Sequence, residues 1–180
     1  MPRSCLSEPT VDGGCDKKPG QSVHMLKSLL VATNLGVLAI YVVGSGLWVS
    51  SGGGYYRSLE QPSWQPPDVV FGIAWPYNFA MLGIVGTLVV LNSGGGARAV
   101  WLGCFAASVV AALAWANLFY IQQNPAASAI ALTVAAALTI PMVVVAFRYN
   151  VWAGVAMLPY LAWLCVATSL AYGYAALNPS

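Results

Sequence analysis

YYRSLEQPSWQPPDVVFGIAW, residues 55–75, is the stretch around which the rest of the chain is arranged. Its three prolines each fix φ and remove a backbone donor, so most of this stretch cannot be helical. The residue before each proline is also pushed toward extended geometry. We therefore predict that Trp64 lies on a stiff, non-helical arm, directly before an apolar helix that begins near Asp68. A rigid aromatic residue in this place is typical of a lid or an anchor at the mouth of a membrane bundle.

The composition excludes a water-soluble domain. Of the 180 residues, 59% are hydrophobic and 7% are charged, whereas soluble domains carry about 25% charged residues. The net charge of +2 is too small to favour nucleic acid as a partner. Because so much of the chain is hydrophobic and so little is charged, its expected surrounding is the lipid bilayer. The four cysteines form no CxxC pair and no cluster with histidine, so no zinc site is predicted.

Five apolar segments are each close to the roughly 20 residues that cross a bilayer core. They are residues 25–49, 69–91, 99–121, 126–147 and 151–176. Backbone polar groups in lipid must be hydrogen-bonded within their own segment, so these segments are expected to be helices. The predicted fold is an all-α membrane protein, a bundle of five transmembrane helices.

The domain organisation is simple. Residues 1–24 are polar, lack an apolar core and predict a disordered tail, and residues 25–180 form the transmembrane domain. The links after the second helix are short, which predicts that sequential helices are antiparallel neighbours.

Basic residues give an orientation. With five spans, Arg57 is alone on one side of the membrane. The other side receives Arg3, Lys17, Lys18, Lys27, Arg98 and Arg148. The positive-inside rule then places the N-terminus in the cytoplasm and the arm outside.

Seven tryptophans are many for a chain of this length. Trp48, Trp101 and Trp152 fall at helix ends, where an aromatic belt at the membrane surface explains them. The four others, at positions 64, 75, 115 and 163, are candidates for a binding site.

Helical spacing adds further residues to this candidate site. Phe79 lies one turn after Trp75, and Tyr160, Trp163 and Ala167 share one helix face through their i, i+3, i+7 spacing. Together the candidates would wall an apolar cavity with a few polar groups, the usual form of a ligand site. The predicted ligand-binding residues are Trp64, Trp75, Phe79, Trp115, Tyr160, Trp163 and Ala167. Aromatic packing between helices is the alternative explanation for each aromatic residue.

Two long motifs resemble the translocator protein family (TspO/MBR, also called peripheral benzodiazepine receptors or tryptophan-rich sensory proteins). LEQPSWQPPDVVFGIAW at residues 59–75 is similar to the family pattern L-x-K-P-x-W-x-P-P-x-W-x-F-x-x-x-W. LPYLAWLCVATSL at residues 158–170 is similar to P-Y-L-x-W-x-x-x-A-x-x-L-N. Between them, the residues from Trp115 to Phe119 and Tyr120 resemble the family's W-x-x-x-F-F stretch.

The resemblance implies a five-helix membrane bundle, often a homodimer, that binds tetrapyrroles such as protoporphyrin IX and haem, and sterols in animals. It also implies that Trp64 and Trp163 are pocket tryptophans that act in light-dependent porphyrin breakdown, and that Trp115 forms part of the ligand wall. The chain departs from the family's pattern at several polar positions. Val69 replaces a tryptophan, Ala171 replaces an asparagine, and residues 108–112 lack two amides. We therefore expect a less polar pocket, which leaves the preferred ligand open.

Three functions compete. The leading hypothesis is a receptor or sensor for tetrapyrrole-like hydrophobic ligands, with Arg57, Gln65 or Asn78 meeting a ligand carboxylate. The second is an enzyme that degrades porphyrin in light through an indole radical; ordinary acid–base catalysis is disfavoured because no paired carboxylates or activated nucleophile are present. The third is passive transport of porphyrins or sterols, since ion-coupled transporters usually carry an ionisable residue within the membrane.

Overall fold

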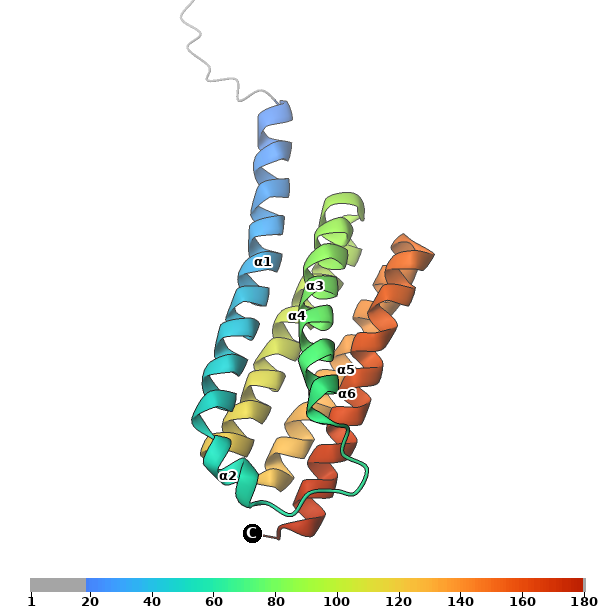
Figure 1. The fold of residues 1–180 in the computed structure, drawn as a ribbon. Coiled ribbons are helices and arrows are strands. Elements are labelled where there is room, and N and C mark those ends of the chain that lie inside the picture. Colours follow the sequence, from blue (N-terminus) through green and yellow to red (C-terminus); the bar gives the residue numbers. More distant parts are fainter. Residues whose placement is uncertain (1–18, 180) are drawn as a thin grey trace, which may run out of the picture.

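The computed structural model describes residues 19–179, and within that range all regular structure is helical (Figure 1). The elements are α1 (Pro19–Ser51), α2 (Gly53–Ser58), α3 (Asp68–Asn92), α4 (Gly95–Ala116), a π-helix (Asn117–Ile121), α5 (Pro125–Tyr149) and α6 (Val151–Leu177). Five helices are long and apolar enough to cross a membrane: α1, α3, α4 with its π-helical end, α5 and α6. The prediction of an all-α bundle of five transmembrane helices is confirmed.

The long helices form a ring. Helix α1 packs against α3 and α4, α5 packs against α4 and α6, and α6 also packs against α3. The predicted pairing of sequential helices is therefore right for α4, α5 and α6. It is wrong for α3 and α4, which touch each other much less because both of them pack on α1.

A buried polar contact explains why α1 draws these two helices together. The Asn34 side chain is fully buried, and its Oδ1 accepts a hydrogen bond of 3.0 Å from Nε1 of Trp101 on α4. On α3, a Cβ atom added to Gly86 would lie 2.4 Å from the same Oδ1. Only a glycine lets α3 approach so closely. The assignment of Trp101 to an aromatic belt is thus wrong, because its indole is completely buried and ties α4 to α1.

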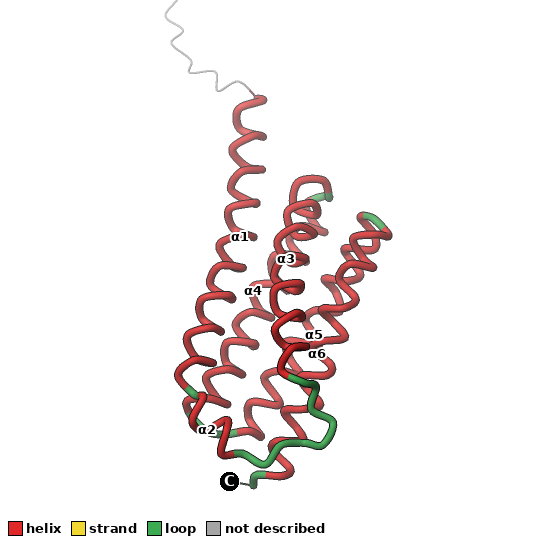
Figure 2. Tube along the Cα trace, in the orientation of Figure 1, coloured by secondary structure: helices red, strands yellow, loops and turns green. Residues whose placement is uncertain are grey.

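Helix α1 begins earlier than the apolar pattern predicts. Residues 19–24 are helical, although the sequence placed them in the disordered tail; the rest of that tail lies outside the described residues. Proline is well suited to the first position of a helix, since its missing N–H needs no partner there, and nothing between positions 20 and 24 blocks continuation. Figure 2 shows the long helix α1 projecting beyond the other four long helices.

The longest non-helical connection joins α2 to α3 and is drawn in green in Figure 2. It comprises residues 59–67, called the arm below, and contains all three prolines of the deciding stretch. The predicted non-helical arm and the predicted start of α3 at Asp68 are confirmed. Helix α2 was not anticipated, and it forms because the prolines all follow it.

The arm lies against the C-terminal end of α6. The backbone N–H of Glu60 donates to Oδ1 of Asn178 at 2.9 Å, and Nδ2 of Asn178 donates to the Glu60 carbonyl at 3.0 Å. Farther along, Pro62 and Trp64 lie directly on Gly173, where an added Cβ would come within 2.8 Å and 2.7 Å of them. The absence of a side chain at Gly173 is therefore what lets the arm lie directly on the helix.

Candidate functional site

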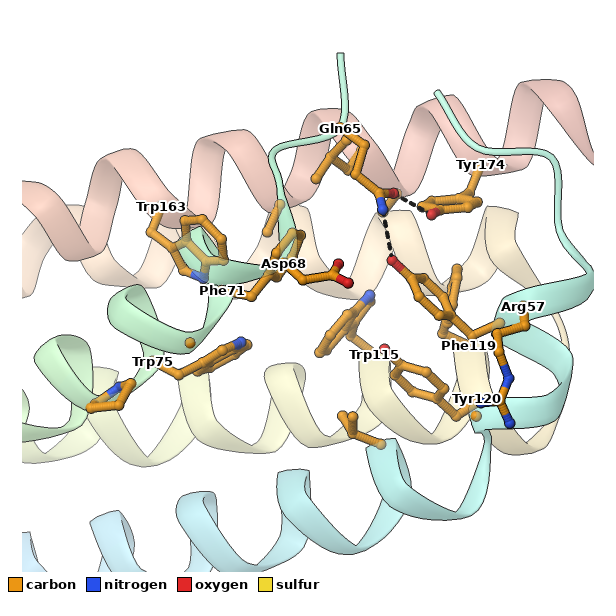
Figure 3. Close-up of a pocket in the computed structure, with 18 residues that line it drawn as sticks. Arg57, Gln65, Asp68, Phe71, Trp75, Trp115, Phe119, Tyr120, Trp163 and Tyr174 are labelled. Carbon is orange, nitrogen blue, oxygen red and sulfur yellow. Dashed lines mark hydrogen bonds between the residues drawn. The ribbon is translucent and has the colours of Figure 1, made fainter. Parts of the chain in front are cut away.

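A cavity of about 740 Å³ lies beneath the arm (Figure 3). Its walls come from α2, α3, α6 and the junction of α4 with the π-helix, and its lining is overwhelmingly apolar. The volume falls within the range of roughly 300–1,000 Å³ that is usual for small-molecule sites. Eight aromatic side chains contribute to the lining: Tyr56, Phe71, Trp75, Trp115, Phe119, Tyr120, Trp163 and Tyr174.

The wall between α3 and α6 is built from edge-to-face aromatic contacts. The rings of Phe71 and Trp163 have centroids 5.0 Å apart at 83°, and those of Trp75 and Trp163 are 6.4 Å apart at 78°. This geometry is the preferred one for aromatic pairs, so it fixes the orientation of the rings. Ala167 and Ala171 continue the same face of α6 with small side chains, which leaves the space of the cavity open.

The opposite wall depends on the π-helix at the end of α4. The N–H of Gln122 donates to the carbonyl of Asn117, five residues earlier, at 3.0 Å. The extra residue in this turn shifts the following side chains by about 100° around the helix axis. Phe119 and Tyr120 both line the cavity from this turn. π-Helical turns are frequent at functional sites.

Polar contacts connect the arm to the rim of the cavity. Nε2 of Gln65 donates to the Tyr56 hydroxyl at 3.0 Å, and the Tyr174 hydroxyl donates to Oε1 of Gln65. One arm residue thereby joins α2 and α6 (Figure 3). Next to this network, partial burial raises the pKa of Tyr55, which therefore stays a neutral phenol around neutral pH.

Three further polar groups lie in the lining. Arg57 comes from α2 and Asp68 from the first turn of α3, and no ion pair joins the two within the described part of the chain. The indole N–H of Trp163 is buried and has no hydrogen-bond partner among residues 19–179. A buried donor without a partner is costly, so this N–H is available to a ligand atom.

The structure brings together four of the predicted site residues, Trp75, Trp115, Trp163 and Ala167, in the lining of the cavity. Of the three polar residues suggested for a ligand carboxylate, Arg57 and Gln65 line the cavity. Asn78 does not: it is buried on α3 beside a separate groove between α3 and α6.

Three predicted residues, Trp64, Phe79 and Tyr160, lie outside this cavity. Trp64 is 56% exposed and packs on the outside of α6, because the turn of the arm directs it over Gly173. The Phe79 ring packs against Tyr41 at 5.2 Å and contributes to helix packing. Tyr160 is buried in the core. Phe79 and Tyr160 therefore take part in aromatic packing between helices, which was the alternative explanation for them.

Several lining residues were missed, and a regular spacing could have found some of them. On α6, Ala171 and Tyr174 extend the face of Trp163 and Ala167 by further helical turns, whereas Tyr160 is too far toward the core. On α3, Phe71 precedes Trp75 by four residues and so shares its face.

The chain is similar to known proteins over nearly all of the described helices. The model of the TspO/MBR family matches residues 31–177. The tryptophan-rich protein TspO of Archaeoglobus fulgidus is 33% identical over 83% of this chain and 96% of that protein. The tryptophan-rich sensory protein of Cereibacter sphaeroides is 30% identical over 69% of this chain and 77% of its own length. The human translocator protein is 28% identical over 72% of this chain and 78% of its own length.

Proposed function

The chain belongs to the TspO/MBR family, and on that premise we propose that it is a membrane receptor or sensor that binds tetrapyrrole-like hydrophobic ligands, such as protoporphyrin IX or haem, in the cavity beneath the arm. The observation that carries this proposal is the cavity itself. The cavity has aromatic walls from three helices and a few polar groups. The arm above it is hydrogen-bonded near both of its ends.

The shape and chemistry of the cavity suit a flat aromatic ligand. Tryptophan and phenylalanine faces stack on extended π-systems, and apolar burial supplies most of the affinity at about 25 cal/mol per Å². Arg57 provides a positive charge for a ligand carboxylate, and charge-assisted hydrogen bonds of this kind are stronger than neutral ones. Among the described residues that line the cavity, none is a histidine, cysteine or methionine. A haem would therefore be held through its ring and its propionates.

The light-dependent enzyme has less support from the geometry. Of the two tryptophans that the family resemblance connects with porphyrin breakdown, Trp163 lines the cavity and Trp64 does not. A ligand in the cavity would thus contact one of these two indoles. We therefore favour binding over breakdown as the function of this site.

Two alanines on opposite sides of α6 provide a matched test. Ala167 lines the cavity, and Ala162 lines the separate outer groove between α3 and α6. In Ala167→Phe the added ring occupies ligand space, so protoporphyrin IX binding should weaken about tenfold or more, since overpacking costs roughly 1–3 kcal/mol. Ala162→Phe should bind like the wild type. The measurement is an absorbance titration in lipid nanodiscs. Saturable binding that both variants weaken equally, or no saturable binding by the wild type, would contradict the proposal.

We also propose that the arm faces the outside of the membrane and the described start of α1 faces the cytoplasm. Arg98 and Arg148 lie at the end of the bundle where α1 begins, whereas Arg57 lies at the end with the arm. The positive-inside rule supports this orientation. A C-terminal reporter that is active only in the cytoplasm would contradict it.

A further inference from the structure

The carboxylate of Asp68 is directed into the cavity. Figure 3 shows it pointing from the start of α3 toward the space beside Trp115, below the arm. Asp68 lies in the first turn of α3, where a negative charge interacts favourably with the helix dipole. No basic residue pairs with it in the described part of the chain, so its charge is available to a ligand.

A second acceptor lies one turn farther along the same helix. Pro76 has no N–H, so the carbonyl of Gly72 lacks the donor it would have in a regular helix. Gly72 and Pro76 both line the cavity, and no side chain at Gly72 covers the backbone. Asp68, Gly72 and Pro76 follow each other at intervals of four residues and so share one face of α3. This face therefore carries the Asp68 carboxylate and, one turn on, a backbone carbonyl to which Pro76 cannot donate.

The surroundings of these acceptors also favour positive charge. Trp75 and Trp115 line the cavity around Asp68, and the faces of indole rings attract cations. Arg57 belongs to α2, and in Figure 3 it lies at the far end of the labelled residues from Trp163. The cavity thus has a negative side on α3 and a positive side on α2.

From this division we infer that Asp68 determines ligand selectivity: the α3 side of the cavity accepts a cationic or N–H-donating part of a hydrophobic ligand and rejects a carboxylate, which is directed toward Arg57. The inference rests on the proposed function, since it names which ligands and which orientation the same cavity prefers. Asp68 acts as a specificity residue in this account, and the aromatic walls supply the affinity that is common to all ligands.

Three porphyrins with one ring system and different side chains test the inference. They are protoporphyrin IX with two carboxylates, its neutral dimethyl ester, and a diamide whose two ethylenediamine arms carry ammonium groups. Each is titrated against the wild type, Asp68→Asn and Arg57→Gln in nanodiscs of zwitterionic lipid, with absorbance as the readout. Asparagine keeps the size of Asp68 and is accepted at helix starts, so only the charge changes.

The expected effects are modest individually and clear as a ratio. Because Asp68 is solvent-exposed, Asp68→Asn should weaken the diamide about threefold and strengthen the diacid about threefold, which changes their affinity ratio about tenfold. Arg57→Gln should change that ratio in the opposite direction, and neither variant should alter ester binding. If all three porphyrins bind but Asp68→Asn leaves the ratio of diamide to diacid affinity unchanged, the inference about Asp68 is wrong and the proposed function still stands. If no porphyrin binds the wild type, the proposed function itself is wrong.

Discussion

Replacing Gly173 with alanine should lift the arm from α6. The new Cβ would lie 2.7 Å from the Trp64 ring and 2.8 Å from the Pro62 ring. The Trp64 side chain is exposed and can rotate away, but the Pro62 ring is bonded to its own backbone nitrogen and cannot. The arm must therefore move, and overpacking of this kind costs about 1–3 kcal/mol.

Two backbone amides report this movement. Glu60 donates to Asn178, and Gln65 donates to the carbonyl of Pro62 at 3.0 Å. This cost destabilises the state in which the arm is packed on α6, so the arm should be detached from α6 for a larger fraction of the time. The hydrogen exchange of both amides should then speed up by about fivefold to a hundredfold. Hydrogen–deuterium exchange of nanodisc samples, followed by mass spectrometry of the peptide around residues 59–67, measures this rate.

A second glycine provides the matched control. Gly103 on α4 is exposed, and no atom of the described residues lies within 4 Å of a Cβ added to it. Gly103→Ala should therefore leave the exchange of the arm unchanged. If the arm amides of Gly173→Ala exchange at the wild-type rate while the long helices stay protected, Gly173 does not determine how the arm packs on α6.

Two other variants test the contacts that hold the fold and the arm. Gly86→Ala should lower the free energy of unfolding by about 1–3 kcal/mol in detergent, because the added Cβ would meet Asn34. Gly36→Ala has open space at its Cβ and should change the free energy of unfolding little. An equal loss of stability in both variants would contradict the packing of α1 on α3. Asn178→Ala removes both bonds to Glu60 and should speed exchange of that amide about tenfold; wild-type exchange there would show that these bonds do not hold the arm.

The sequence was sufficient for the parts of the fold that depend on local chemistry. Long apolar runs predict helices in lipid, and the prolines predict the arm and the start of α3, because each of these rules acts within a few residues. Asn124 was also predictable as the cap of α5: its side chain accepts from the N–H of Ala127, and Pro125 follows it.

The site was only partly predictable, because helical spacing identifies a face without saying what that face meets. Trp163 and Tyr160 are three residues apart on α6, yet Trp163 faces the cavity and Tyr160 faces the core. Trp101 stands at a helix end like a belt residue, but its partner Asn34 is 67 positions away. Such contacts are set by the ring of helices and leave no local pattern.

The π-helix illustrates the same limit. Residues 117–121 continue an apolar helix in sequence, with no proline or glycine to mark a change. In the folded chain Phe119 packs against Tyr174 of α6, with ring centroids 5.5 Å apart, and this contact cannot be read from the local sequence. Asp68 was missed as a lining residue for a related reason, since an aspartate at a helix start has an ordinary explanation without a ligand.

Photolabelling can locate hydrophobic ligands bound inside the ring of helices beneath the arm. A protoporphyrin derivative with a diazirine is irradiated on the protein in nanodiscs, with and without excess unlabelled protoporphyrin IX, and the modified residues are located by mass spectrometry. We expect displaceable labelling of lining residues such as Trp75, Trp115 and Ala167. Labelling confined to outward-facing residues such as Ile73 and Val110, which are 67% and 68% exposed, would contradict it.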